Sequence, residues 1–527
     1  MRITNKIMQR NNLSNINTNK VYQDKLSTQM STQKKINKPS DDPVVAIRAL
    51  RLRSSVTEVT QYYSKNIPDA KSWLNVTEEA LKNLSQIMTN MIARCTKGAN
   101  GELKTEERQI ILEELKALGD EIYSTGDADY AGRYVFTGFR TDTSLSFLKE
   151  TTLHYSITEQ LGTGSIDTLT YVDTGKLLDI NSANFDDTTG TPPIGSIDET
   201  QISATDVYRI RLAYGDCTDV DADGNPMLPK IEYTDPATGQ TAQIPPAPAT
   251  VTVIHSYDDP YKNVGKGDVV FVPETGELLL GEDHYKTLMS VKDNDSTTNK
   301  DEGEIRVTYA KDHWNKGDLR PQHYFACTST DADKNKIEYN STYLDGNVAR
   351  QEIEYDVGFN QTIRVNSTAD ECFQPGIGRE TDDIVNAMQD VLDLEGTMAT
   401  LEKLKKEHEG DPAKTKIIER QLEAVDKALT YAKNKEQKLF EKGITTYQKH
   451  LDDSNLCITN CGTRSSKLSL IENRMQNQKT TFETLKSENE DADITEVAIH
   501  LNSAELTYEA ALMATGKVMQ TTLLNFI

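Results

Sequence analysis

One loop in the sequence has carboxylates at the spacing of a metal site. Asp219, Asp221 and Asp223 alternate along the chain and Gly224 follows them, as in the first half of a calcium-binding loop. The twelfth position of such a loop should hold a bidentate Glu, but here it is Lys230, and two prolines interrupt the path. An acidic turn accounts for the pattern better than a metal site does, and opportunistic calcium binding by Asp219–Asp223 stays the alternative.

Residues that could act as nucleophiles or bases are not grouped elsewhere. Cys457 and Cys461 lie four residues apart on one side of an expected helix, which favours small buried residues over a redox or metal pair. The 8 His occur singly, and the chain has no phosphate-binding, dinucleotide-binding, zinc-protease or serine-hydrolase motif. We therefore predict no catalytic residue, no cofactor-binding residue and no metal ligand.

Composition and charge narrow the classes of function further. A chain of 527 residues corresponds to about three or four domains. Its net charge of −24 makes nucleic acid and anionic membrane surfaces poor partners. The low apolar content predicts an elongated or multi-part molecule rather than one globule. Six Cys are too few for a disulfide framework, no apolar run predicts membrane insertion, and the N-terminus lacks a cleavable secretory signal. Export by another route remains open.

Both ends of the chain have helical periodicity. From Val44 to Cys95 apolar residues recur at steps of three and four, which predicts a long helix with a narrow seam. We expect Ser40 to cap this helix and Pro43 to occupy its first turn. Pro68 should kink it, because a proline inside a helix removes a hydrogen bond. A second helix is expected from about Thr105.

The remainder reads as a β-rich middle followed by more helices. From about Thr141 to Pro375 the chain alternates polar and apolar residues between Gly, Pro and Asp turns, for example at 207–214, 249–257 and 304–309. The segments 172–179 and 273–281 share a TG(K/E)LL pattern that predicts tight turns. Helical spacing returns after Pro375, with a charged helical stretch at about 400–442. The expected fold is multidomain α+β, with long terminal helices paired as coiled-coil or bundle rods around a β-rich insertion.

The two termini carry opposite charge. Residues 1–40 contain eight Lys or Arg and one Asp, whereas residues 488–527 contain seven acids and one Lys. This asymmetry favours packing of the first helix against the last, in the same molecule or in a neighbour. The first segment is too polar to be a stable helix alone, so we expect it to order only when something packs on it.

Four stretches resemble the flagellin superfamily, and within it the flagellar hook-associated protein 3 (hook–filament junction) family. They are the opening 56 residues, QIMTNMIARCTKGANGELKTEERQ with AGRYVFTGFRTDT at 131–143, QEIEYDVGFNQTIRVN at 351–366, and the close from ADITEVAIH. The most telling is the run Asn37, Lys38, Pro39, Ser40, Asp41, Asp42 and Pro43. Its prolines flank the acids, where filament flagellins usually have small residues. The Arg51 and Arg53 of RLRS also resemble the junction family.

The resemblance implies a secreted structural subunit without enzymatic activity, located extracellularly at the hook–filament junction of the bacterial flagellum. Its implied partners are hook-associated protein 1, flagellin, copies of itself in a ring, and a cytoplasmic flagellar export chaperone. Export would follow the flagellar type III route. A filament flagellin, or a secreted glycan-binding adhesin acting through the β-rich middle, remain the alternatives.

The resemblance also implies a division of the chain. Residues 1–42 and 488–527 would form an inner helical domain, 43–140 and 376–487 an outer helical rod, and 141–375 a solvent-facing β-rich domain. The expected assembly contacts are apolar residues of the inner domain: Ile3, Ile7, Leu13, Leu501, Tyr508, Leu512 and Val518.

Overall fold

The computed structural model describes residues 5–100, 103–220, 225–235, 240–262, 264–291, 305–330, 335–345 and 351–520, without the side chains of Asn5 and of residues 518–520. The chain divides into two compact units. Unit 1 comprises residues 1–71, 355–363 and 465–527, and unit 2 comprises residues 72–354 and 364–464.

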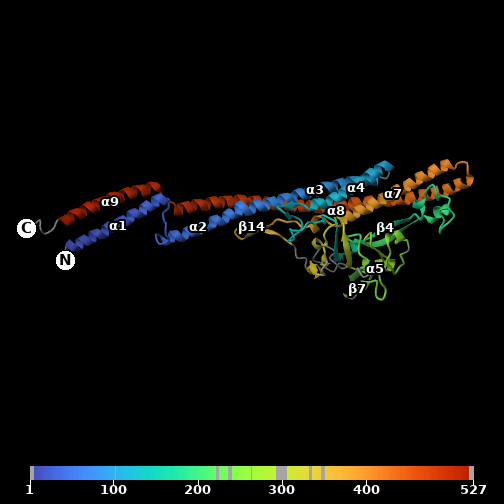
Figure 1. The fold of residues 1–527 in the computed structure, drawn as a ribbon, viewed down its shortest axis with the longest axis horizontal. Helices are drawn as coiled ribbons and strands as arrows, with labels where there is room; N and C mark the ends of the chain where they lie inside the picture. Colours follow the sequence, from blue (N-terminus) through green and yellow to red (C-terminus); the bar gives the residue numbers. More distant parts are fainter. Residues whose placement is uncertain are drawn as a thin grey trace, which may run out of the picture. The chain divides into compact units, whose positions relative to one another are not determined.

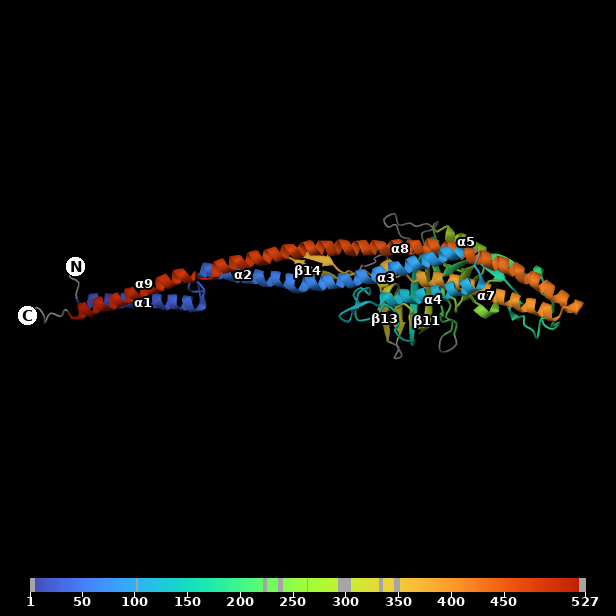
Figure 2. The same cartoon turned by 90° about the horizontal axis from the view of Figure 1, so that it is seen from above.

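Unit 1 consists mainly of helices from the two ends of the chain. Helix α1 (Asn5–Thr32) lies beside α9 (Ile494–Gln520), as both views show (Figures 1 and 2). Helix α2 (Pro43–Gln61), the start of α3 (Ile67–Ala99), the end of α8 (Pro412–Glu490) and the two-stranded sheet β14 (Glu354–Gly358) and β15 (Gln361–Arg364) complete the unit. The pairing of the first helix with the last, predicted from the terminal charges, is thereby confirmed.

The chain is helical on both sides of Pro68, the residue at which the sequence predicted a kink. Residues Tyr62–Asn66 form a π-helical turn between α2 and α3, in which the Ile67 N–H bonds to the carbonyl of Tyr62. Pro68 then occupies the first turn of α3. A wide turn at this point accommodates a residue that has no N–H to donate, so the chain stays helical through the proline.

The helices of unit 2 bury the seam that the sequence predicted. In α3 the side chains of Leu74, Leu81, Leu84, Met88, Met91 and Cys95 are fully buried. Helix α8 packs beside them, since the Ser454 hydroxyl and the Cys461 thiol donate to the carbonyls of Leu81 and Leu74. Helix α4 (Thr105–Gly126) contacts α7 (Gly376–Glu407). Helix α6 (Ala369–Cys372) is a single helical turn that precedes α7 in the chain.

Two larger sheets form the β-rich part of unit 2. The six-stranded sheet has the order β13-β12-β3-β11-β6-β7 and the five-stranded sheet the order β4-β5-β10-β9-β8. Their pairs are antiparallel except for β8 with β9. The strands of the first are Lys336–Tyr339, Ala326–Thr330, Thr151–Leu161, Ile305–Trp314, Lys230–Thr234 and Thr241–Ile244. Those of the second are Ile166–Asp173, Ser203–Arg211, Glu277–Leu280, Val269–Val272 and Thr252–Val253.

Smaller elements flank these sheets. A short hairpin, β1 (Asp129–Tyr130) with β2 (Arg133–Tyr134), precedes them, and helix α5 (Glu282–Met289) follows β10. The predicted strand at 249–257 is mostly wrong, since only Thr252 and Val253 pair with a neighbour. The chain turns away at Ser256–Asp258, where the His255 ring is bonded to the Glu274 carboxylate. At this turn, the hydrogen bond between the His255 and Glu274 side chains takes the place of backbone pairing between strands.

The charged stretch at about 400–442 is the end of a helical hairpin. Helix α7 ends at Glu407 and α8 begins at Pro412, with Asp411 accepting from the Ala413 and Lys414 N–H groups. The residues between Leu177 and Ile202 cover this hairpin with a small apolar core. The buried Gln421 amide holds the cover in place by donating to the carbonyls of Phe185 and Ile194. The core residues are Leu177, Ile180, Phe185, Ile197, Ile202, Leu401, Leu404, Ile418, Val425 and Leu429.

A buried ionic cluster joins the five-stranded sheet to helices α7 and α8 within unit 2. The Arg209 guanidinium on β5 contacts three carboxylates, those of Asp167, Glu277 and Asp383. Arg211 shares Asp383, while Lys442 on α8 pairs with Asp167 at 2.9 Å and with Glu380 at 2.8 Å. The charges are thus paired on every side, which is the condition for burying them.

A second buried carboxylate, Glu159 on β3, has no ion pair among the described residues. It accepts hydrogen bonds from the Tyr309 hydroxyl and from the Ala213 N–H. Burial outweighs these bonds and raises the pKa of Glu159 from 4.5 to about 7. A raised pKa in the folded state gives stability that is present in acid and lost as the pH rises through about 7.

We therefore expect Glu159→Gln to stabilise unit 2 at pH 8 by about 3 kcal/mol, the value of the pKa shift, and to change little at pH 5. Glutamine keeps the acceptor oxygen and removes the charge. Urea unfolding of both variants at the two pH values, followed by tryptophan fluorescence, measures the difference. His323 and His450, whose pKa values burial lowers, act equally in both variants and cancel. An equal effect at both pH values would contradict the assignment.

Candidate assembly surface on the terminal helices

Helices α1 and α9 pack antiparallel through a small apolar contact. Leu26 of α1 is buried against Val497 and Ala504 of α9, with Leu501 at the edge. Farther along, the contact becomes polar, and the Gln23 amide lies 3.5 Å from the Glu505 carboxylate. Few apolar side chains therefore hold the pair together.

Most large apolar residues of this pair face outward instead. On α1 the exposed set is Ile7, Met8, Leu13, Val21, Tyr22 and Met30, and on α9 it is Ile494, Ile499, Leu506, Leu512 and Met513. Single exposed apolar residues are ordinary, but a set of this size along two adjacent helices is typical of a surface that another molecule covers.

The seven residues expected to make assembly contacts separate into three groups. Ile7, Leu13 and Leu512 are exposed by 51%, 60% and 45%. Leu501 and Tyr508 are half-buried, and Leu501 packs toward α1. Ile3 and the side chain of Val518 lie outside the described residues. Within one chain, then, only Leu501 belongs to the apolar contact between the two helices.

A short antiparallel clasp closes the pair at one end. The Lys35 N–H donates to the Glu490 carbonyl at 2.7 Å, and the Ala492 N–H donates to the Gln33 carbonyl at 3.0 Å. The ammonium groups of Lys34 and Lys35 add contacts to the Asp491 carboxylate and the Glu488 carbonyl. This clasp, residues 33–35 with 490–492, fixes the register of α1 against α9.

The motif at 37–43 shapes the entry into α2, but Ser40 is not its cap. Asp42 is the N-cap, and its carboxylate accepts from the Val44 and Val45 N–H groups at 2.9 and 3.1 Å. Pro43 occupies the first helical position, so the cap must be the residue directly before it. Ser40 is two residues too early.

Asp41 has a different task from Asp42. It accepts from the N–H groups of Lys38 and Asn37 and so closes the turn before the helix. These two bonds lower the pKa of Asp41. Pro39 and Ser40 are exposed between them. Each acid of the motif therefore has a structural role in the same turn.

Arg53 and Arg51 of RLRS differ sharply in surroundings. The Arg53 guanidinium makes two hydrogen bonds, of 2.6 and 2.7 Å, to the Glu490 carboxylate, which is 2% exposed. The bond to Arg53 is the main reason why the pKa of Glu490 lies below its usual range. Arg51 is exposed, and its guanidinium has no ion pair within the part of the chain that the structure describes. Arg53 thus ties α2 to the residue at which the clasp begins.

Arg53→Ala should therefore destabilise unit 1 by about 1–3 kcal/mol, because the buried Glu490 carboxylate loses its two short hydrogen bonds and keeps only the longer ion pair with Lys34, at 3.7 Å, among the described residues. Arg51→Ala is the matched control and should change stability by less than about 0.5 kcal/mol. Hydrogen exchange of α1 and α9 in the full chain measures both. The difference in stability between the two variants should become smaller in acid. The reason is that the lowered pKa of Glu490 gives stability that is lost as the pH falls through that pKa. Equal exchange in the two variants would exclude the proposed tie.

No enzymatic constellation is found among the described residues. They contain no group of three or more His, Cys, Asp or Glu that could hold a metal ion, and no helix long and apolar enough to span a membrane. Asp219 lies 3.7 Å from His255, but residues 221–224 of the acidic loop are outside the described residues. Cys457 and Cys461 are buried free thiols, as expected.

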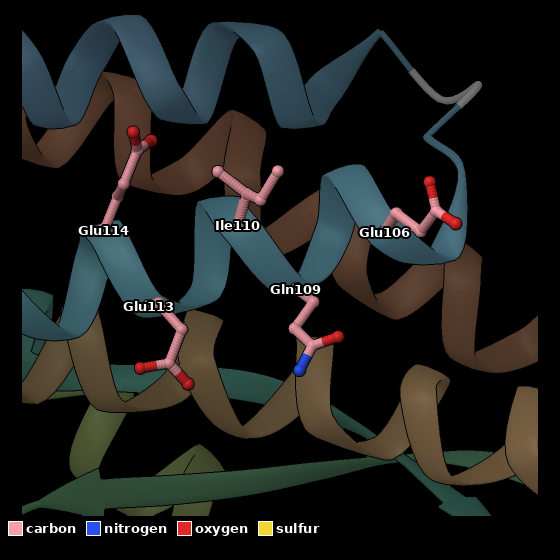
Figure 3. Close-up of a pocket in the computed structure, with 5 residues that line it drawn as sticks. All are labelled: Glu106, Gln109, Ile110, Glu113 and Glu114. Atoms are coloured by element: carbon pink, nitrogen blue, oxygen red, sulfur yellow. The ribbon is translucent and has the colours of Figure 1, made fainter.

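The surface of α4 has a shallow hollow (Figure 3). It is lined by Glu106, Gln109, Ile110, Glu113 and Glu114, all from the same helix. The carboxylates point in different directions, and Glu114 is paired with Arg94 at 2.7 Å. A surface of this kind offers neither a base beside a nucleophile nor an enclosed binding site.

Sequence reasoning missed Glu490 as a functional residue. It belongs to a run of acids, Glu488 to Asp491, at the point where α8 ends. The opposite charges of the two termini were the available clue. They indicate that the helices meet but not which carboxylate meets which arginine.

Comparison with known proteins identifies the N-terminal part of the chain. Residues 3–141 match the bacterial flagellin N-terminal helical region. Flagellar hook-associated protein 3 of Salmonella typhimurium is 28% identical over 144 residues, and that of Escherichia coli is 27% identical over 146. Each match covers 27% of this chain and 45% of the relative, so the chain spans about half the length of the curated relatives it matches. The resemblance inferred from the sequence is confirmed over this region.

One solved structure matches over a longer stretch. It is flagellar hook-associated protein-3 from Legionella pneumophila, which covers 83% of this chain and 98% of its own length, with 11% identity and a TM-score of 0.30. At this level the match supports no argument about the arrangement of the parts.

Proposed function

This chain carries the N-terminal helical region of the bacterial flagellins and there resembles flagellar hook-associated protein 3, and on that premise we propose that it is a structural subunit of the flagellum. It acts as the adapter between hook-associated protein 1 at the hook end and the flagellin filament. It has no enzymatic activity and needs no cofactor. The resemblance favours this role over a filament flagellin or an adhesin.

The observation that carries the proposal is the outward apolar surface of α1 and α9. Eleven large apolar side chains are exposed on these two helices, whereas the apolar contact between them buries Leu26, Val497 and Ala504 among the described residues. Covering this surface with neighbouring subunits would supply most of the missing burial. The pair is therefore built to be completed by assembly.

The mechanism of the adapter is packing. Residues 1–42 and 488–527 order together as an inner layer, and Ile3, Ile7, Leu13, Leu501, Tyr508, Leu512 and Val518 make its contacts with neighbouring copies in a ring. Residues 43–140 and 376–487 form the outer helical layer, and residues 141–375 face the medium. The chain leaves the cell through the flagellar type III route after an export chaperone has shielded its C-terminal helix.

Deletion of the gene tests this function. We expect bare hooks by electron microscopy and flagellin shed into the culture medium, because exported subunits then find no template. Loss of filaments without shed flagellin would instead identify the chain as the filament subunit. Intact filaments would exclude both flagellar roles and favour an adhesin, whose β-rich part should then bind glycans.

A further inference from the structure

Helix α2 has an exposed face that the contacts of one chain leave uncovered. Val44, Ile47 and Leu50 recur at steps of three and are exposed by 59%, 54% and 64%. Arg48 and Arg51 flank them on the same side, are exposed, and form no ion pair within the ranges that the structure describes. Opposite this face, Ala46 and Ala49 are buried. The face is thus an apolar strip with two free cations, which we call the α2 strip.

The outward face of α9 has the complementary pattern. Ile499, Leu506 and Met513 recur at steps of seven and are exposed by 63%, 68% and 67%. Glu505 and Glu509, one helical turn apart, lie along one side of Leu506, and both are exposed. Among the described residues, these two carboxylates have one hydrogen-bond contact, the long one from the Gln23 amide to Glu505. This face, the α9 strip, is therefore an apolar row with two anions along one side.

From these two faces, and resting on the proposed function, we propose that the α2 strip of one copy binds the α9 strip of a second copy. Leu506 packs against Ile47 and Leu50, while Glu505 and Glu509 pair with Arg48 and Arg51. Opposite charges around an apolar centre give such a contact its specificity and its register. Like charges would oppose pairing of two α2 strips or of two α9 strips.

This contact joins different surfaces of the two copies. A contact of that type repeats from copy to copy, and it closes into a ring or continues as a helical array according to its rotation. A symmetric dimer, in which both copies use the same face, would instead end after two copies. The proposal therefore specifies which surfaces a ring of adapters uses.

Photo-crosslinking on the full chain tests the contact. Ile47 is replaced by the photoreactive residue p-benzoylphenylalanine, and both the purified chain and isolated flagella are irradiated. We expect a dimer whose crosslinked peptide lies within residues 494–520 of the second copy. The same residue at Leu470, which is 72% exposed on α8, is the matched control and should give no such peptide. Absence of the peptide from both samples, or attachment to another protein alone, overturns the proposal.

Charge-reversal variants provide a second test of the contact. Arg48→Glu with Arg51→Glu should abolish the crosslinked dimer, and adding Glu505→Arg with Glu509→Arg should restore it. All four residues are exposed, so folding of unit 1 is expected to be unaffected, which hydrogen exchange of α1, α2 and α9 checks. Failure of the rescue overturns the pairing. The proposed function fails separately, if deletion of the gene leaves filaments intact, whatever the crosslinking shows.

Discussion

Replacement of Arg209 by leucine is expected to destabilise unit 2 by about 3–5 kcal/mol, the usual cost of removing one partner from a buried ion pair. The guanidinium is 1% exposed and is the shared partner of Asp167, Glu277 and Asp383. Its removal leaves Glu277, exposed by 4%, without an ion-pair partner among the described residues, and leaves Asp383, exposed by 8%, paired with Arg211 alone. Leucine cannot hydrogen-bond to any of the three.

The lowered pKa of Asp167 also indicates that Arg209 stabilises the cluster. Burial acts to raise the pKa of Asp167, but the hydrogen bond and charge of Arg209, aided by Lys442, outweigh it and lower the pKa to about 2. A lowered pKa gives stability that is lost only as the pH falls through that value. The intact cluster should therefore persist in mild acid, whereas the Arg209→Leu variant should already be weakened at neutral pH.

Urea unfolding followed by tryptophan fluorescence measures this effect. Trp73 and Trp314 are the two Trp of the chain, and both belong to unit 2. Arg211→Leu is the matched control, because Arg211 pairs with Asp383 alone and Arg209 would still neutralise that carboxylate. It should cost less than Arg209→Leu. A loss below about 1 kcal/mol for Arg209→Leu would contradict a structural role of the cluster.

Two glycines in the shared TG(K/E)LL pattern should respond very differently to alanine. Gly175 and Gly276 both have positive φ, at 54° and 60°. A Cβ on Gly175 would meet nothing within 4 Å, whereas one on Gly276 would lie 1.9 Å from the Tyr214 carbonyl oxygen. The backbone must therefore shift only at Gly276, which forms the turn between β9 and β10.

We expect Gly175→Ala to cost about 1–2 kcal/mol, the penalty of a left-handed conformation for an L-residue. Gly276→Ala should cost this amount and about 1–3 kcal/mol more, because the clash is with backbone and not with a flexible side chain. Thermal or urea unfolding of unit 2 ranks the two variants. Similar losses would mean that Tyr214 moves aside without strain.

These turns also illustrate what the sequence can and cannot predict. The pattern predicted a turn at both places, but only 273–281 joins two strands, whereas 172–179 continues into a single 3₁₀ turn, Leu177–Asp179. The reason is that Leu177 belongs to the apolar core over the helical hairpin. Local spacing predicts a turn; the destination of the chain after it depends on distant residues.

The helices show the same limit. The buried seam from Leu74 to Cys95 followed directly from spacing, because a helix repeats locally. The many charges of the stretch at about 400–442 gave no indication that Leu401, Leu404 and Ile418 lie under residues 177–202. Likewise, the choice between Ser40 and Asp42 as cap depended on where Pro43 begins the helix.

The distribution of cysteines has a practical consequence. All six are buried free thiols within unit 2, and unit 1 has none. Burial raises the pKa of Cys95, Cys217 and Cys327 to about 12, so these thiols should react slowly with maleimides while the chain is folded. A cysteine introduced on an exposed face of α1, α2 or α9 can then be labelled without removing any native thiol. Fluorophores placed there would report on unit 1, and slow modification of the native thiols would report independently on the opening of unit 2.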